Sequence, residues 1–248
     1  MTPVYRFGEA LGNCFLLIDY RSPATPKMEP KEWIAFAKDE QRCIDQLIEI
    51  HPNHLVFYNQ DGSSAEACGN GTRCAALWLS EDSNTQKTWH LETAGGPLQV
   101  HVHDRDNIAV TFPAPEHKTM PDFKVNLPLL APPDVVTIGN PHLVLWLADH
   151  AAVDIHHWGP ILEHSFPERI NVSFAVRENK ETISLKVWER GAGATQACGT
   201  AACATHVSAL CHGFVGDTSC VQQIGGKLSI HWPGPGNTLT LTGPATLE

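Results

Sequence analysis

One short pattern in this sequence occurs twice, and the repetition limits what the chain can fold into. The stretch EACGNGTRCAALW, residues 66–78, is echoed by QACGTAACATHVS, residues 196–208. Each copy places Ala-Cys-Gly before an Ala-rich apolar run, which is typical of an enclosed helix that begins just after the cysteine. The duplication therefore predicts two similar units, each built around one such helix.

Composition indicates an ordinary globular protein and argues against several partners. The chain has 248 residues, 42% of them hydrophobic, enough for one large domain or two of ordinary size. A formal net charge of -10 at pH 7 makes a nucleic-acid partner unexpected, because phosphate binding relies on clustered Lys and Arg. We recognise neither an export signal nor the ~20 apolar residues that a membrane span requires, so we expect a cytoplasmic protein without a membrane partner.

Most of the predicted elements are strands, and helices are fewer. Alternating or β-branched apolar residues predict strands at 14–20, 54–59, 98–112, 142–149, 171–176, 182–189, 227–232 and 238–243. The segments 101–112 and 173–189 look like hairpins, so the sheets should be largely antiparallel. Helices are predicted near the start of 30–50 and, as enclosed helices, at 71–82 and 199–213.

A proline-rich segment separates the two halves. Six prolines between Phe112 and Asp134 favour an extended connection over packed structure. With one Cys-Gly helix start on either side, the chain is predicted to contain two copies of a strand-rich unit wrapped around a central helix.

The paired cysteines permit an unusual reaction. Cys68 and Cys198 precede helix starts, where unpaired backbone N–H groups bind anions and lower the pKa of a thiol. Gly69 and Gly199 would let a ligand approach the backbone closely. One thiolate could remove an α-proton while a thiol on the opposite face returns a proton, which would invert the stereochemistry without a cofactor. The intermediate carbanion would need hydrogen-bond donors in a site closed to water.

Other interpretations of the cysteines stay open at this point. Small buried hydrophobes are the expectation for Cys14, Cys43, Cys74, Cys203, Cys211 and Cys220. A zinc site could combine Cys68, Cys74, Cys198 and Cys203, although the intervening segments of five and four residues belong to apolar helices. A Cys–His hydrolase would use one Cys-Gly element and leave the other idle. Disulfides are not expected in a long chain without an export signal.

Nine segments, several of them long, add a more specific signal. They are LGNCFLLID (11–19), IDQL (44–47), YNQDGSSAEACGNGTRCAA (58–76), TAGG (93–96), IGNPH (138–142), FPERINVSF (166–174), WERGAGATQACGTAACA (188–204), GGKLSIHW (225–232) and TGPA (242–245). In these motifs, and in their order, the chain resembles the diaminopimelate epimerase family of cofactor-independent amino-acid racemases.

The resemblance implies a fold and a domain division. The fold would be α+β, with two pseudo-symmetric domains, each a curved, mostly antiparallel sheet around a central helix, and an active site in the cleft between them. The domains would comprise residues 1–113 plus 239–248, which include the Cys68 helix, and residues 114–238, which include the Cys198 helix. The last strand would cross back to complete the first domain.

The implied activity is interconversion of LL- and meso-2,6-diaminopimelate, serving lysine and peptidoglycan biosynthesis, with no pyridoxal phosphate and no metal. One alternative is a racemase of the same fold for another amino acid, such as histidine. Another is a binding relative that has lost the chemistry. A homodimer stays open.

The family's functional residues carry over onto matching positions. Cys68 and Cys198 would be the acid–base pair. The reacting carboxylate would be held by Gly69, Asn70, Gly199 and Thr200, with Asn13 and Gln46 nearby, and the distal amino-acid end by Asn59, Asn140, Asn171, Glu189 and Arg190. Glu189 and Arg190 can supply an ammonium acceptor and a forked carboxylate donor, although adjacent Glu and Arg more commonly form a surface ion pair.

A few positions depart from the family pattern or have two interpretations. Cys14 stands where the family usually has Asp, Cys43 where it has a small residue, and Ala194 where many members have Glu. We expect position 14 to support the site without touching substrate. His142 would either support the cleft or be a satisfied structural histidine.

Overall fold

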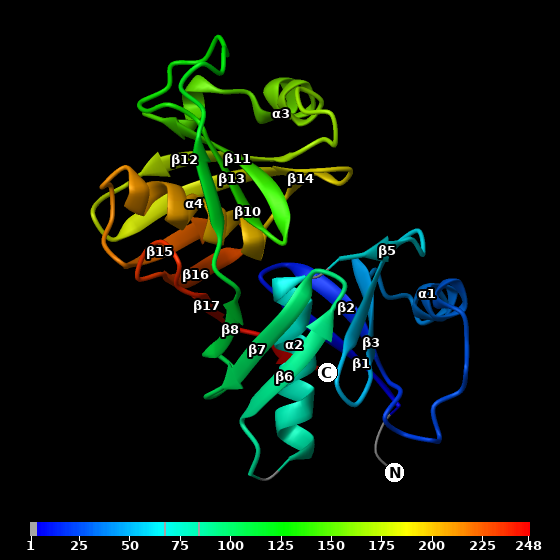
Figure 1. Cartoon of the computed structure of the whole chain (residues 1–248). Coiled ribbons are helices and arrows are strands. Elements are labelled where there is room, and N and C mark those ends of the chain that lie inside the picture. Colours follow the sequence, from blue (N-terminus) through cyan, green and yellow to red (C-terminus); the bar gives the residue numbers. More distant parts are fainter. Residues whose placement is uncertain (1–3, 67, 84) are drawn as a thin grey trace. The chain divides into compact units, whose positions relative to one another are not determined.

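The computed structural model describes residues 4–66, 68–83 and 85–248, which group into two compact units. Unit 1 comprises residues up to Thr111 together with Thr242–Glu248, and unit 2 comprises Phe112–Leu241. Strand β17, Leu239–Gly243, runs through the second boundary and returns the chain to unit 1 (Figure 1). Ala67, inside the first of the duplicated stretches, lies outside the described residues.

Unit 1 contains a sheet with the strand order β18-β1-β2-β3-β4-β5, followed in the chain by a helix and an antiparallel meander. The bounds of its elements are β1 Tyr5–Ala10, β2 Asn13–Asp19, α1 Pro30–Asp39, β3 Gln46–Ile50, β4 Leu55–Asn59, β5 Ser64–Ala65, α2 Gly69–Asp82, β6 Thr88–Thr93, β7 Gly96–Val102, β8 Ile108–Phe112 and β18 Thr246–Leu247. Within this sheet β2 and β3 are parallel and the other pairs are antiparallel.

Unit 2 repeats the same succession. Its elements are β9 Glu116–Thr119, β10 Asp134–Ile138, β11 Asn140–Leu147, a short 3-10 helix His150–Ala152, α3 Ile155–Glu163, β12 Asn171–Arg177, β13 Thr182–Glu189, β14 Gly193–Thr195, α4 Gly199–Cys211, β15 Thr218–Gln223 and β16 Gly226–His231. Strands β11 and β12 are parallel around α3, as β2 and β3 are around α1. The repeat indicated by the Cys-Gly stretches therefore extends over the topology of both units.

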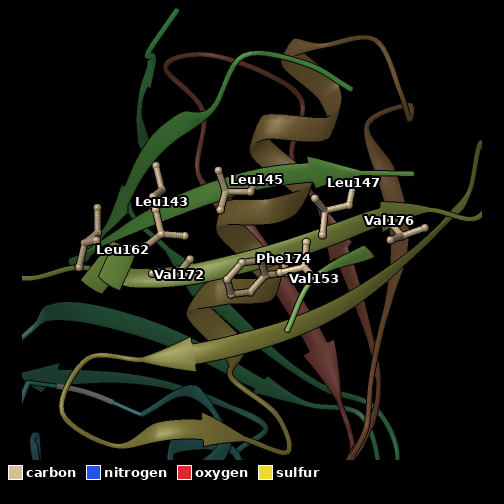
Figure 2. Packing of buried hydrophobic residues seen from close by; sticks show 9 residues of the cluster. Leu143, Leu145, Leu147, Val153, Leu162, Val172, Phe174 and Val176 are labelled. Atoms are coloured by element: carbon tan, nitrogen blue, oxygen red, sulfur yellow. The ribbon is translucent and has the colours of Figure 1, made fainter. Parts of the chain in front are cut away.

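A helix covers each face of the main sheet in both units. In unit 2, apolar residues that alternate along β11 and β12 pack with Leu162 of α3 (Figure 2). On the opposite face, the Trp146 indole N–H donates to Ser208 Oγ of α4 at 2.8 Å. In unit 1, Leu16 and Ile18 pack with residues of α1, whereas Phe15 approaches α2. Strands covered on both faces read as continuous apolar runs, as β11 and β12 do.

Close approach to the sheet explains the small residues of α2. A Cβ atom on Gly71 would lie 2.5 Å from Ile48 Cδ1 and 3.2 Å from Phe15, so a larger residue would push the helix off the sheet. Arg73 is fully buried in the same helix, where its guanidinium donates to Gly69 O at 3.2 Å and to Pro244 O at 3.0 Å. These bonds offset the cost of burying a charge.

The α+β class, the enclosed helices at 71–82 and 199–213, and both predicted hairpins are confirmed. The helix predicted near the start of 30–50 is α1, Pro30–Asp39. The central strand Gln46–Ile50, between β2 and β4, was not among the predicted strands. The sequence also gave no sign of α3, whose Gly159 and Pro160 are typical helix breakers.

The proline-rich segment is more packed than predicted. It contains β9, which pairs with β10, and its hydrophobic residues contact the unit 2 core. Those residues are Phe123, Val125, Leu127 and Leu129. Alternating apolar residues give an extended chain one face to bury, so the prolines here shape a packed segment and not a linker.

The prediction that six cysteines are buried is wrong for most of them. Cys74 and Cys203 are buried in α2 and α4, whereas Cys14, Cys43 and Cys211 are exposed and Cys220 is partly exposed. Cys14 precedes the buried part of β2, and Cys211 is the last residue of α4. Across the described ranges, no helix has the length and apolar character that crossing a membrane demands.

A buried carboxylate joins α4 to the edge strands of unit 2. Asp134 is fully buried, and its oxygens lie 3.0 Å from His117 Nε2 and 2.8 Å from His212 Nε2. Ser208 Oγ also donates to Asp134. Burial alone would raise the Asp134 pKa, but the hydrogen bonds from His117 and Ser208, with the charge of His212, lower it overall. A lowered pKa means that the folded state favours the ionised form.

We expect Asp134→Asn to reduce the free energy of unfolding at pH 7 by about 3 kcal/mol, because it breaks a buried charged network. The contribution of Asp134 is present above its unfolded pKa of about 3.9 and disappears as the pH falls through the lower folded pKa. Urea unfolding between pH 3 and pH 7 should therefore show a flatter acid limb in the variant. Asp122→Asn, which changes an exposed carboxyl, is the matched control, and equal losses in both variants would contradict the prediction.

Candidate active-site residues of the two units

Cys68 is the N-cap residue of α2 and is partly buried. Its Sγ accepts the Gly71 N–H at 3.4 Å, and its carbonyl accepts both the N–H and the hydroxyl of Thr72 at 2.8 Å. The start of the helix thus directs donors toward the cysteine, as the sequence predicted from the Cys-Gly pair.

A hairpin turn holds the chain just before each cysteine. In unit 1 the turn between β6 and β7 donates the Gly95 N–H to Glu66 O at 2.8 Å. In unit 2 the turn between β15 and β16 donates the Gly225 N–H to Gln196 O at 2.9 Å. Both acceptors lie two residues before a Cys-Gly pair. The segments TAGG and QIGG therefore fix the approach to the two helices.

The other predicted residues of unit 1 lie at one edge of its sheet. Asn13 and Gln46 begin the parallel strands β2 and β3, and Asn59 ends the antiparallel β4, so all three face the same edge. Gln46 Nε2 donates to Asn59 Oδ1 at 3.3 Å. Asn70, in the first turn of α2, donates to Asn13 Oδ1 at 2.6 Å and accepts from Arg73 at 3.0 Å. Cys14 leaves this contact of Asn13 intact.

Unit 2 places its predicted residues at the equivalent edge. Asn140 and Asn171 begin the parallel strands β11 and β12, and Glu189 ends β13. Asn171 donates to Pro141 O at 2.9 Å, and its Oδ1 accepts the backbone N–H of Arg190 at 3.0 Å. Glu189 Oε1 accepts from the hydroxyl of Thr195 at 2.5 Å.

The two sets occupy matching positions in the repeated topology. The four pairs, in the order first strand, second strand, third strand and helix cap, are Asn13 with Asn140, Gln46 with Asn171, Asn59 with Glu189, and Cys68 with Cys198. Asn70 and Thr200, each two residues after its cysteine, extend the correspondence into the helices. Each unit therefore brings its own half of the predicted residues together.

Cys198 behaves differently from the expectation for a helix N-terminus. It caps α4 and is only 7% exposed. Burial, with the nearby Glu189 carboxylate as a second cause, raises the pKa of the Cys198 thiol well above its usual value. Its Sγ lies 3.5 Å from Thr200 Oγ1. The sequence predicted a lowered pKa; desolvation outweighs the helix N-terminus here.

His142 is fully buried beside Asn140. Its Nε2 lies 3.0 Å from Asn140 Oδ1, whereas its Nδ1 makes no hydrogen bond to any described residue. Burial first, and then the charge of Arg190, lower the His142 pKa to about 3. The ring is therefore neutral near pH 7, and it is only half satisfied, unlike the structural histidine that the sequence left open.

Three further residues contact the predicted residues or their neighbours, and the sequence analysis did not identify them. Gln223 Oε1 accepts the Cys198 N–H at 2.8 Å, Arg73 holds Asn70, and Glu163 contacts the segments around Asn171 and Arg190. A single Arg within an apolar helix was a signal for Arg73. Nothing in the sequence around Gln223 or Glu163 distinguishes these buried polar residues from exposed ones.

The zinc site considered from the sequence is not supported by the described residues. No group of three or more His, Cys, Asp or Glu side chains among residues 4–66, 68–83 and 85–248 is arranged to hold an ion. Cys74 is buried inside α2, and burial raises its pKa. A thiol with a raised pKa is a poor zinc ligand, since zinc binds the thiolate.

We expect Glu189→Gln to lower the pKa of Cys198, because it removes the negative charge that opposes the thiolate. Alkylation of Cys198 by iodoacetamide should then rise at a lower pH than in the unchanged protein, measured by mass spectrometry between pH 7 and pH 10. Glu181→Gln, on the exposed turn between β12 and β13, is the control. The same alkylation profile in Glu189→Gln and the unchanged protein would refute the link.

Known proteins match this chain over nearly its whole length. The sequence model of the family described as diaminopimelate epimerase matches residues 8–117 and 135–248. A protein named diaminopimelate epimerase from Brucella anthropi is 36% identical over 264 residues, covering 96% of this chain and 87% of the relative. Another of that name from Pseudomonas fluorescens strain Pf0-1 is 38% identical over 263 residues, with coverages of 95% and 93%.

A solved structure extends the likeness to the fold. The structure of a predicted epimerase from Pseudomonas aeruginosa superposes with a TM-score of 0.74 at 15% sequence identity, covering 98% of this chain and 96% of that one. The matched residues include both Cys-Gly stretches and the strand ends that carry the predicted polar residues. The chain therefore belongs to the diaminopimelate epimerase family.

Proposed function

We propose that this protein interconverts LL- and meso-2,6-diaminopimelate without pyridoxal phosphate, as an isomerase of lysine and peptidoglycan biosynthesis in the cytoplasm. The observation that carries the proposal is the repeated sheet edge, where each unit presents a helix-capping cysteine and amide side chains at the strand ends, with the Glu189 carboxylate added in unit 2. Relatives named diaminopimelate epimerase match nearly the whole length of the chain.

In the proposed reaction, Cys68 and Cys198 act on opposite faces of one α-carbon. The thiolate of one cysteine takes the α-proton, so that the C–H bond breaks as an S–H bond forms. The thiol of the other gives its proton to the opposite face of the carbanion. The roles exchange in the reverse direction, and no net proton or electron is consumed.

The raised pKa of Cys198 suits one half of this cycle. A thiol held in its protonated form is ready to donate, and the Glu189 carboxylate nearby favours that form. When Cys198 must instead act as the base, Glu189 is a candidate acceptor for the thiol proton. The same carboxylate can attract a substrate ammonium group, so its negative charge supports both roles.

Binding would divide between the helix starts and the strand ends. Backbone N–H groups at Gly69, Asn70, Gly199 and Thr200 would hold the reacting carboxylate, where the partial positive charge of a helix start stabilises an anion. Asn13 and Gln46 would lie beside them. Asn59, Asn140, Asn171, Glu189 and Arg190 would hold the distal amino-acid end. A doubly charged end group explains the need for both an acid and a guanidinium.

The proposal divides the chain into two epimerase domains, 1–113 plus 239–248 and 114–238, each of which supplies one of the two cysteines. Closure over the substrate would keep water from the carbanion. Whether two such chains form a homodimer is a separate part of the proposal, which sedimentation equilibrium of the purified protein measures directly.

The test is proton NMR of the reduced protein with LL-diaminopimelate in deuterium oxide. We expect loss of the α-proton signal together with appearance of the meso isomer, without added metal or pyridoxal phosphate. Cys68→Ala and Cys198→Ala should each lower the rate at least ~100-fold, because each removes a positioned acid or base. Cys211→Ala, which changes an exposed thiol at the opposite end of α4 from Cys198, should leave the rate unchanged.

Other outcomes point to other functions. Deuterium uptake into histidine or another amino acid, but not into diaminopimelate, would indicate a racemase with a different substrate. Absence of exchange with every amino acid tried would indicate a binding protein of the same fold. Substantial turnover in Cys198→Ala would refute the two-cysteine mechanism.

A further inference from the structure

Glu163, the last residue of α3, places a carboxylate in the interior of unit 2. The residue is only 3% exposed, and it is separate from every residue assigned a role above in binding or proton transfer. An ionised carboxylate at such depth requires several donors. Those donors come from two segments, one that follows α3 directly and one that lies 25 to 28 residues further along the chain.

The first segment is the turn after β13. The Trp188 indole N–H donates to Glu163 Oε2 at 2.7 Å, and the Gly191 backbone N–H donates to Oε1 at 2.9 Å. These donors stand on either side of Glu189 and Arg190. The carboxylate therefore spans the whole turn that carries the two charged residues.

The second segment leads into β12. Arg169 donates to Glu163 Oε1, and the Ile170 backbone N–H donates to the Glu163 carbonyl at 3.2 Å. Arg169 has φ of 59°, a conformation that is uncommon for a residue with a side chain and is maintained only by its surroundings. Asn171 follows directly and is connected to the turn by its bond with the Arg190 N–H.

Packing reinforces the hydrogen bonds. A Cβ atom on Gly159, one turn before Glu163 in α3, would lie 2.4 Å from the Trp188 ring. The indole therefore rests directly on the helix backbone while its N–H reaches Glu163. The combined hydrogen bonds outweigh desolvation, the largest influence on this group, and lower the Glu163 pKa.

We infer that Glu163 is a positioning residue, which holds Asn171 and Arg190 in the geometry that binds the distal amino-acid end of the substrate. It touches no substrate atom itself. The inference rests on the proposed function for the identity of that substrate. The structural part of the inference, that Glu163 fixes the Arg190 turn, stands on the contacts alone.

Glu163→Gln tests the structural part first. A carboxamide keeps the volume but turns one acceptor oxygen into a donor, which opposes either the Trp188 N–H or the Gly191 N–H. Hydrogen–deuterium exchange should become faster at Arg190 and Gly191 while exchange in β15, β16 and α4 stays unchanged. Unchanged exchange at the turn, or faster exchange throughout unit 2, would overturn the inference.

Steady-state kinetics with LL-diaminopimelate test the functional part. We expect the KM of Glu163→Gln to rise roughly 10- to 100-fold, because the loss of a well-placed hydrogen bond to a charged substrate group weakens binding by a factor of that order. The kcat value should fall by a smaller factor. Glu181→Gln, which alters an exposed carboxyl of the same unit, is the matched control. A fall in kcat with unchanged KM would overturn the positioning role.

A double variant separates positioning from general damage. Trp188→Phe removes the indole donor, so in Glu163→Gln/Trp188→Phe the amide group meets no opposing donor and its oxygen can accept the Gly191 N–H. The KM of the double variant should therefore be lower than that of Glu163→Gln and closer to that of the unchanged protein. A KM that rises further, as the sum of two independent losses, would overturn the inference.

The readouts keep this inference apart from the proposed function. If the unchanged protein does not epimerise diaminopimelate, the proposed substrate fails, and exchange at Arg190 and Gly191 still decides whether Glu163 fixes the turn. If the unchanged protein is active and Glu163→Gln alters neither exchange nor KM, the inference alone fails.

Discussion

The burial of two helices between sheet strands is the constraint on which the rest of the structure depends. Because α2 and α4 are enclosed along most of their length, the positions of closest approach to the sheet require very small residues, as Gly71 shows. The backbone N–H groups in the first turn of each helix have no partner within the helix, so they need acceptors at its N-terminal end. The same end carries the cysteine and the polar strand termini of each unit, so the packing of the helices also determines where these residues gather.

The two halves share this plan but differ in the environment of the thiol. Cys68 is partly buried and accepts a backbone N–H, whereas Cys198 is almost fully buried near a carboxylate. A duplicated fold can therefore diverge at a single position without losing its symmetry of topology. The repeated topology therefore does not impose the same burial or the same charged neighbours on the two thiols.

Sequence patterns predicted the features that depend on local composition. The duplicated Cys-Gly helices could be predicted because Ala-rich runs are apolar on all sides, and the hairpins because polar residues interrupt alternating strands. Family motifs then supplied the polar residues at the strand ends. The contacts of Glu163 and Gln223 could not be predicted from the sequence. These contacts join residues 25 to 28 positions apart, which only the tertiary fold brings close together. The burial of cysteines was misjudged for a related reason: residue type does not reveal on which side of a strand or helix end a thiol lies.

The return of the chain to unit 1 at residue 242 has a consequence for the entropy of folding. Pro244 O accepts from the buried Arg73 guanidinium, Ala245 N–H donates to Arg105 O, and β18 pairs with β1. All of these contacts join segments of unit 1 that unit 2 separates in the chain. The Arg73–Pro244 bond alone closes a span of 171 residues. Closing so long a span costs more chain entropy than pairing neighbouring strands, so the contacts of the returning segment are the most demanding ones that unit 1 makes.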